Sequence, residues 1–274
     1  MLNKIKNILY HIFYKYGYIR NYILFPICGF FRKKHIYPFC QGYEFIDDLR
    51  GKHTGKRCFI LATGPSLIKE DVERLNGEIT IAVNSFYKLF DSSTFRPSYY
   101  MVLDPDVQNT VLLNNKYPIE SWAKNAIFMN SISEERLPSV YYLPYCYQNH
   151  WFKVLDIGFN HGKNLKFTED ILYGIYDKYT VTNAAIDMAI HMGCKEIYLL
   201  GVDCNYSGPQ QYFLKPDKGT FTPNEIQAML LQKSMMTGYH FMERETRKRG
   251  IKIFNATRGG MLEAFERVNF DDIV

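Results

Sequence analysis

Apolar runs alternate with helical patterns along most of this chain. Mostly apolar or β-branched runs at 58–62, 78–83, 99–103, 126–129, 140–143, 195–203 and 251–254 predict buried strands. Apolar residues at helical spacing predict helices over 67–75, 182–192 and 225–248, and Gly193 and Gly250 follow the last two as stop signals. Because strands alternate with helices and several strands end in a polar residue, the pattern predicts an α/β fold: an open, mostly parallel sheet with flanking helices.

The loop after the first predicted strand is Thr63-Gly64-Pro65-Ser66. Gly64 permits a close backbone approach or a positive φ, Pro65 fixes the next φ, and Ser66 is expected to cap the following helix. Such a loop presents backbone N–H groups at a helix N-terminus, which favours a phosphate. The alternative is a plain strand-to-helix turn without a ligand. Neither a Walker loop nor a complete G-x-G-x-x-G motif is present.

Polar residues also follow the other predicted strands. Asn84 follows the second strand, Asp104 begins Asp104-Pro105-Asp106 after the third, and Asp203 ends the run at 195–203. We expect ligand groups along this carboxyl edge, where Asp203 would bind a sugar hydroxyl or transfer a proton, or else cap a turn. Asp104 and Asp106 would share a cation or mark a turn. Residues 205–224 are rich in Gly, Pro, Ser and Asn and are interpreted as a loop or lid.

Residues 1–43 are interpreted as a separate basic, aromatic, amphipathic helical segment. The first 34 residues carry seven basic side chains and no acidic one, whereas the remainder has 26 basic against 28 acidic residues. The longest uncharged run of this segment, 21–31, is shorter than the roughly 20 residues that a spanning helix needs. We therefore expect peripheral contact with the inner leaflet of the membrane; packing on the main domain or on another subunit is the alternative. Residues 44–55 are expected to be a linker, and 56–274 a catalytic domain.

Composition restricts the class of protein further. Apolar residues make up 47% of the chain, enough for a substantial core, and the nearly neutral main domain excludes a nucleic-acid-binding protein. No cleavable signal peptide is recognisable. The six cysteines lack paired spacing, which indicates reduced thiols in the cytoplasm and neither a disulfide framework nor a zinc site.

Four blocks occur together in the same order as in a known family: 60–67, 83–87, 193–203 and 255–260. Over roughly residues 56–270 the chain resembles the 6-hydroxymethylpterin diphosphokinase-like family of bacterial surface-polysaccharide loci. That family is similar to the small bacterial sialyltransferases that use CMP-sialic acid and to the motility-associated factor glycosyltransferases.

The resemblance implies a Rossmann-like, metal-independent transferase without a cofactor. It would take a sialic-acid-like sugar from a CMP-activated donor to a glycan or glycolipid acceptor of the lipopolysaccharide or capsule, and an oligomer is compatible with it. The implied donor-binding residues are Thr63, Gly64, Pro65, Ser66, Asn84 and Asp104, with Thr180 and Thr182 beside the sugar carboxylate. Tyr206 and Tyr212 correspond to tyrosines that hydrogen-bond the departing phosphate.

This chain departs from the sialyltransferase pattern at three places. Those enzymes have Asn where this chain has Thr63 and Asp104, and they place a His base before the final helix. Here no His lies between His191 and His240, so Asp203 and His240 are the candidate bases. Two other functions stay open: pyrophosphate transfer from ATP to a hydroxymethylpterin, with Mg²⁺ between Asp104 and Asp106, and a non-catalytic scaffold that binds a nucleotide sugar.

Overall fold

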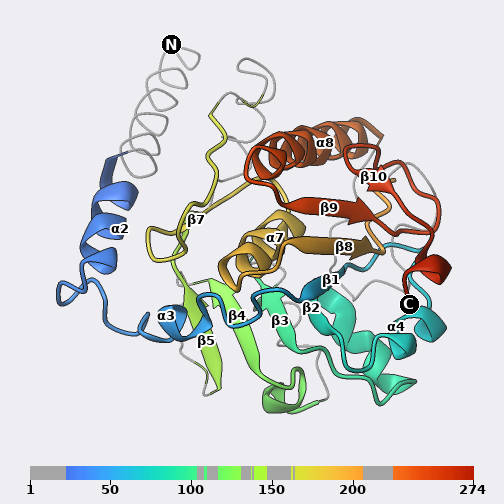
Figure 1. Ribbon diagram of the computed structural model, residues 1–274, viewed down its shortest axis with the longest axis horizontal. Coiled ribbons are helices and arrows are strands. Elements are labelled where there is room, and N and C mark those ends of the chain that lie inside the picture. The colour runs from blue at the N-terminus through green and yellow to red at the C-terminus, as the bar shows by residue number, and fades with distance from the viewer. Residues whose placement is uncertain are drawn as a thin grey trace, which may run out of the picture.

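A parallel sheet of eight strands forms the centre of the computed structural model, which describes residues 23–103, 108–109, 117–130, 137, 139–146, 162, 164–205 and 225–274 (Figure 1). The strand order is β10-β9-β8-β1-β2-β3-β4-β5, and every pair is parallel. The strands are β1 (Arg57–Leu61), β2 (Ile79–Val83), β3 (Tyr99–Val102), β4 (Ala126–Asn130), β5 (Val140–Leu143), β8 (Glu196–Leu200), β9 (Lys252–Asn255) and β10 (Glu266–Arg267). A second, two-stranded sheet pairs β6 (Tyr145–Cys146) with β7 (Ile175–Tyr176). The α/β fold class expected from the sequence is confirmed.

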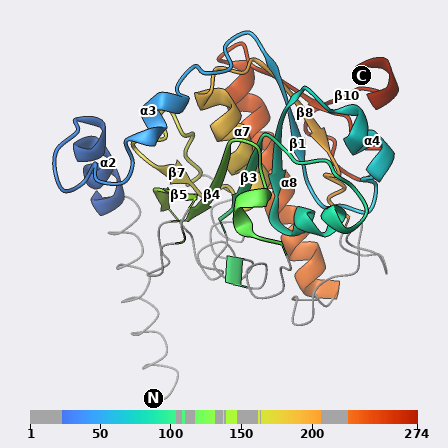
Figure 2. The same ribbon diagram turned by 90° about the horizontal axis from the view of Figure 1, so that it is seen from below.

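Helices cover both faces of the sheet. They are α2 (Phe25–Lys33), α3 (Phe45–Leu49), α4 (Lys69–Arg74), α7 (Val181–His191) and α8 (Glu225–Arg247), with 3-10 turns η2 (Asn84–Asp91), η3 (Ile119–Ser121) and η5 (Phe270–Asp272). Alternate strand residues face two separate cores: Ile60 and Ile81 pack with α7, whereas Phe59 and Ala82 pack with α4 and η2. In Figure 2, β1 and β8 lie between α7 and α4. The strands are apolar on both sides because both faces are buried.

The order of the strands reverses direction between β1 and β8. From β1 the chain adds β2, β3, β4 and β5 on one side, and it then returns to place β8 on the other side. In open parallel sheets this switch creates a crevice outside the carboxyl ends of the two neighbouring strands, where ligands bind. The loops after β1 and β8 therefore border the place where a ligand site is expected.

The segment 44–55, expected as a linker, packs on the body of the protein. It contains α3, whose Ile46 and Leu49 are buried in the core. The backbone N–H groups of Gly51 and His53 donate to the carbonyl oxygens of His191 (3.0 Å) and Met192 (2.7 Å). Residues 1–22 of the predicted amphipathic segment lie outside the described residues, within which no helix has the length and apolar character of a membrane span.

Candidate functional site

The Gly64 loop lies directly against the end of β8. The Ala62 and Gly64 N–H groups donate to the carbonyl oxygens of Leu200 (2.9 Å) and Gly201 (2.8 Å), extending the pairing of β1 and β8 beyond the strands. A Cβ at position 64 would overlap Asp203 Oδ2 and lie 2.5 Å from the Gly201 oxygen. Glycine is required here because another part of the protein approaches the backbone.

Ser66 binds Asp203 and does not cap α4. Its Oγ donates to Asp203 Oδ2 at 2.7 Å, while α4 begins at Lys69 and its N-cap, Ile68, has no side-chain capping bond. The expected Ser66 cap is therefore wrong. The physical reason is register: Ser66 lies two residues before the N-cap, and its hydroxyl instead makes a charge-assisted hydrogen bond to the carboxylate.

Asp203 has the environment of an acid–base group. The residue is only 7% exposed, and burial raises the pKa of its carboxyl, while the hydrogen bonds from Ser66 oppose that rise. A carboxyl with a raised pKa, beside the switch point, is suited to accept a proton near neutral pH.

The block at 255–260 fixes the backbone around Asp203. Met261 N donates to the Asp203 carbonyl oxygen at 2.7 Å, and Val202 N donates to Thr257 Oγ1 at 3.1 Å. A Cβ at Gly260 would come within 2.8 Å of Asp203 Cα. These residues therefore support the carboxylate from behind, a role that the sequence did not reveal.

Asn84 stands at the carboxyl end of β2, the neighbour of β1, in a left-handed conformation (φ 52°). The Tyr100 hydroxyl holds this turn, since it donates to the Asn84 carbonyl oxygen and accepts from Tyr87 N at 2.8 Å. Asn84 Oδ1 is buried and has no hydrogen-bond partner within the described residues. Gln108 Oε1, after β3, is a second such oxygen, which the sequence did not single out. Buried acceptors without partners are costly, so a ligand donor is the natural complement.

Thr180 and Thr182 begin α7, which precedes β8 and therefore starts at the same edge of the sheet. Thr180 Oγ1 caps the helix by accepting from Thr182 N at 3.3 Å, and Thr182 is 3% exposed. Tyr239 of α8 is buried nearby: burial and neighbouring Cys204 raise the pKa of its hydroxyl, while the Thr182 and Thr180 side chains oppose that rise. Tyr239 therefore lies between the α7 N-terminus and the residue after Asp203.

His240 is exposed on α8, next to the inward-facing Tyr239. Thr63 and Pro65 lie half-buried in the Gly64 loop. Asp104, Tyr206 and Tyr212, and the lid expected at 205–224 apart from Asn205, lie outside the described residues. The roles assigned to all these residues stay predictions.

A buried ion pair supports the start of α7. Lys178 Nζ lies 2.5 Å from Asp187 Oδ2, and both side chains are fully buried. Thr168 Oγ1 also donates to Asp187 Oδ2 (2.8 Å), and the Lys178 carbonyl oxygen accepts from Asn183 Nδ2 (2.8 Å). Within the described residues no group of three or more His, Cys, Asp or Glu side chains could hold a metal ion.

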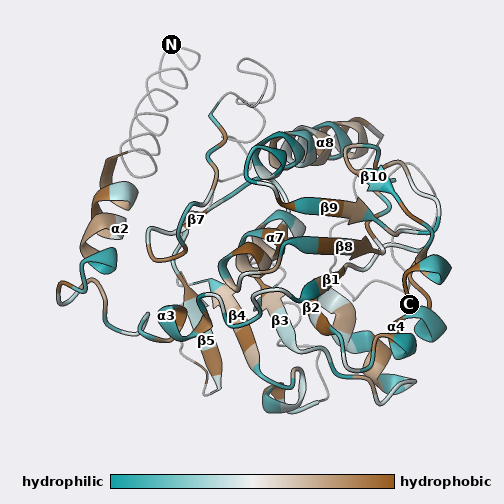
Figure 3. Cartoon of the chain, in the orientation of Figure 1, coloured by the Kyte–Doolittle hydropathy of each residue, from teal (hydrophilic) through white to brown (hydrophobic). Residues whose placement is uncertain are grey.

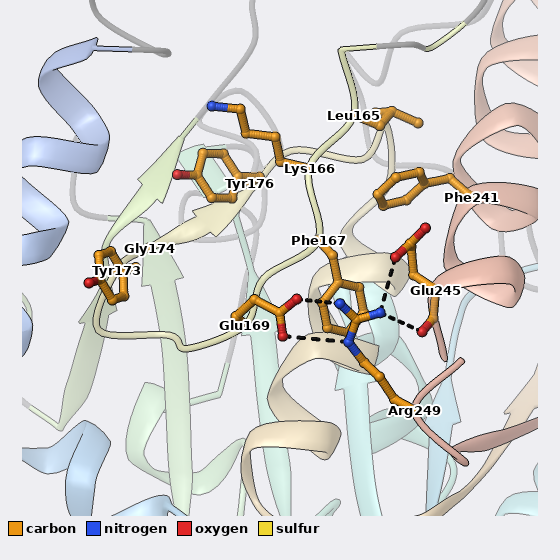
Figure 4. Close-up of a pocket in the computed structure, with 10 residues that line it drawn as sticks. All are labelled: Leu165, Lys166, Phe167, Glu169, Tyr173, Gly174, Tyr176, Phe241, Glu245 and Arg249. Carbon is orange, nitrogen blue, oxygen red and sulfur yellow. Dashed lines mark hydrogen bonds and ion pairs between the residues drawn. The ribbon is translucent and has the colours of Figure 1, made fainter. Parts of the chain in front are cut away.

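A hollow of about 540 Å³ lies beside the C-terminal half of α8, away from the carboxyl edge (Figure 4). Three of its charged side chains are paired with one another: Arg249 binds Glu169 and Glu245 and lies over the Phe167 ring, 4.1 Å from its centroid. The carboxyl-edge site, with its orphan oxygens, is the stronger candidate for the functional site.

Comparison with known proteins gives one family match. The family model described as 6-hydroxymethylpterin diphosphokinase MptE-like matches residues 34–209, which include the Gly64 loop, Asn84 and Asp203. This confirms the resemblance found in the sequence. No curated protein matches the chain.

Solved structures resemble the chain at low identity. The MAf glycosyltransferase from Magnetospirillum magneticum AMB-1 is 16% identical with a TM-score of 0.47; the match covers 85% of this chain and 38% of that one. The sialyltransferase CstII from Campylobacter jejuni, in complex with cytidine-5'-monophosphate, is 18% identical with a TM-score of 0.48 over 78% of this chain and 85% of that one.

Proposed function

This chain belongs to the 6-hydroxymethylpterin diphosphokinase MptE-like family, and from that premise we propose that it is a glycosyltransferase whose nucleotide-sugar donor binds at the carboxyl edge of the sheet. The donor we propose is a CMP-activated, sialic-acid-like sugar. The acceptor is a glycan or glycolipid of surface-glycan assembly.

The observation that carries this proposal is the orphan Oδ1 of Asn84 beside the switch point. A side-chain oxygen held in the left-handed turn by Tyr100 is suited to an N–H or O–H donor, such as a cytosine amino group or a ribose hydroxyl. The four sequence blocks that this chain shares with the 6-hydroxymethylpterin diphosphokinase-like family also lie at the ends of neighbouring strands β2, β1, β8 and β9. That convergence supports one ligand site assembled from all four.

In the proposed reaction Asp203 is the general base. Its carboxylate takes the proton from an acceptor hydroxyl, whose oxygen forms the new bond to the anomeric carbon of the sugar. The bond from that carbon to the phosphate oxygen breaks, and CMP leaves with the electron pair. Ser66 orients the carboxylate, and Thr180 at the start of α7 would lie beside the carboxylate of the donor sugar.

A thermal-shift screen of the full chain tests this function. Stabilisation by CMP, about 2.7 kcal/mol at a hundredfold excess over Kd, is expected, with no shift from ATP and Mg²⁺. The family description favours pyrophosphate transfer as the second candidate, and a shift with ATP and Mg²⁺ alone would replace our proposal by it. No shift with any nucleotide would contradict all three functions, because the scaffold alternative also binds a nucleotide sugar.

Replacing Asn84 by Gly is expected to weaken CMP binding about tenfold, since one hydrogen bond of about 1.4 kcal/mol is lost. Glycine tolerates the left-handed φ, so the turn itself should persist. Calorimetric titration measures the Kd. Ser139→Gly, at another left-handed position away from this edge, is the matched control and should bind CMP as the parent does. Equal affinity in the Asn84→Gly variant would contradict the ligand role.

Ser66→Ala is expected to shift the acidic limb of the kcat/KM profile to higher pH. The hydrogen bond from the Ser66 hydroxyl lowers the pKa of Asp203, so its loss lets burial raise that pKa further, and a higher pH is then needed to form the carboxylate base. The measurement is kcat/KM against pH, with Ser92→Ala, whose hydroxyl donates to the Leu89 carbonyl oxygen, as the control. A limb that stays in place would exclude Asp203 as the base.

A further inference from the structure

Exposed apolar side chains gather on α2 and on the loop after it. Of the twelve large hydrophobic residues that are exposed in the described part of the chain, seven fall within residues 23–39. They are 37–75% exposed: Ile23, Leu24, Ile27, Phe30, Ile36, Tyr37 and Phe39. We call these seven the α2 surface. Isolated exposed hydrophobic residues are normal, but a cluster of this kind marks an interaction surface.

The opposite side of α2 is fixed to the body of the protein. Arg32, 6% exposed, donates from Nε to the Leu172 carbonyl oxygen (2.8 Å) and from Nη2 to that of Tyr173 (2.9 Å). A Cβ at Gly29 would overlap the Tyr173 oxygen, and the Phe25 ring packs edge-on against Tyr176, 5.5 Å between centroids. Tyr173 and Tyr176 belong to the segment that also borders the hollow in Figure 4.

Helical geometry shows that the two sides are separate faces. At about 100° per residue, positions 25, 29 and 32 share one stripe, and positions 23, 27 and 30 share another, about 160° away. The first stripe is the docked side, and the second contains the exposed Ile23, Ile27 and Phe30. The α2 surface therefore faces outward because α2 is held from behind.

Charge identifies the occupant of this surface. The first 34 residues carry seven basic side chains and no acidic one. Exposed Lys34 follows the helix, next to Lys33, whose ammonium pairs with Asp170 at 3.0 Å, and Figure 3 shows the apolar colouring of α2 giving way to hydrophilic residues at that end. An exposed apolar helical face in the most basic part of the sequence, with Tyr37 and Phe39 beside it, matches the boundary between acyl chains and anionic headgroups.

We propose that the α2 surface binds an anionic lipid bilayer, and that the contacts of Arg32 and Gly29 attach this membrane-binding face firmly to the sheet domain. The inference is independent of the donor and of the transferase chemistry. It assigns the membrane contact to specific side chains of α2 and its loop.

Vesicle co-sedimentation of the full chain tests the proposal. The parent protein should bind phosphatidylcholine vesicles that contain phosphatidylglycerol and should bind pure phosphatidylcholine far less. The partition coefficient of the triple variant Ile23→Ser, Ile27→Ser, Phe30→Ser should fall at least about tenfold. Each substitution removes one apolar side chain that would be buried in the bilayer. The control triple, Ile226→Ser, Met229→Ser, Met261→Ser, removes apolar residues of α8 and its surroundings that are at least comparably exposed, and it should bind as the parent does.

Two results would overturn the proposal. Equal partition of the parent and the α2 triple variant would show that this surface is not in the membrane. The second result is a parent protein that binds neither type of vesicle and sediments as a dimer, while the triple variant sediments as a monomer in sedimentation-velocity experiments. It would assign the surface to a second copy of the chain.

Discussion

Gly64→Ala is expected to abolish CMP binding and to lower the free energy of unfolding by about 1–3 kcal/mol, the usual cost of overpacking. The added methyl would overlap Asp203 Oδ2 and press on the Gly201 carbonyl oxygen, so the loop and the end of β8 must move apart. That movement separates Ser66 from Asp203 and breaks the Gly64 N–H bond to Gly201. Urea unfolding gives the stability, and calorimetric titration gives the CMP affinity.

Gly259→Ala is the matched control for this effect. Gly259 lies after β9 at the same edge, with φ 78° and no atom within 4 Å of its prospective Cβ. Alanine there should cost about 1–2 kcal/mol of left-handed strain and leave CMP binding intact. If Gly64→Ala binds CMP as tightly as Gly259→Ala does, the loop is an ordinary strand-to-helix turn.

Most of the fold could be predicted because its signals are local. The runs that became β1, β2, β3 and β8 are continuous apolar stretches, as strands buried on both faces must be. Helix α7 was recognised from its apolar positions and from Gly193, whose φ of 91° ends it. In contrast, α3 was missed because five residues are too few to show a helical period, although two of them, Ile46 and Leu49, are buried.

The candidate site was less predictable because its contacts are distant in sequence. Ser66 and Asp203 are 137 residues apart, so nothing near Ser66 indicated that it would bind a carboxylate and not cap α4. On α8, the sequence singles out His240 by its residue type, whereas the spacing of apolar residues along the helix shows better which side chains face the core. Met235, Tyr239 and Met242 form one stripe at helical spacing, and this stripe faces the core while His240 is exposed.

Breaking the Lys178–Asp187 pair is expected to destabilise the protein more than any other single side-chain change considered. Both groups are fully buried 2.5 Å apart, so Lys178→Met or Asp187→Leu leaves one polar partner buried without its counter-ion, at a cost of about 3–5 kcal/mol. Burial raises the pKa of Asp187 even with Lys178 present, so the carboxylate depends on its partner to remain charged. A displacement of residue 178 should also reach the site, since its backbone carbonyl oxygen accepts from Asn183 Nδ2 in the first turn of α7.

The double variant Lys178→Met, Asp187→Leu separates the ion pair from simple packing. With both charges gone and apolar side chains of similar volume in their place, the double variant should be more stable than either single variant, because the desolvation cost disappears together with the attraction. Urea unfolding of the four proteins completes the cycle, and the surface pair Arg247–Glu243 on α8, 3.3 Å apart, serves as the control whose removal should change little. Additive losses in the double variant would mean that each side chain acts through its own packing. Recovered stability in the double variant would show that apolar packing can replace the contribution of the ion pair to the fold. Weakened CMP binding in the same variant would show that the ion pair is needed to place the α7 N-terminus at the carboxyl edge.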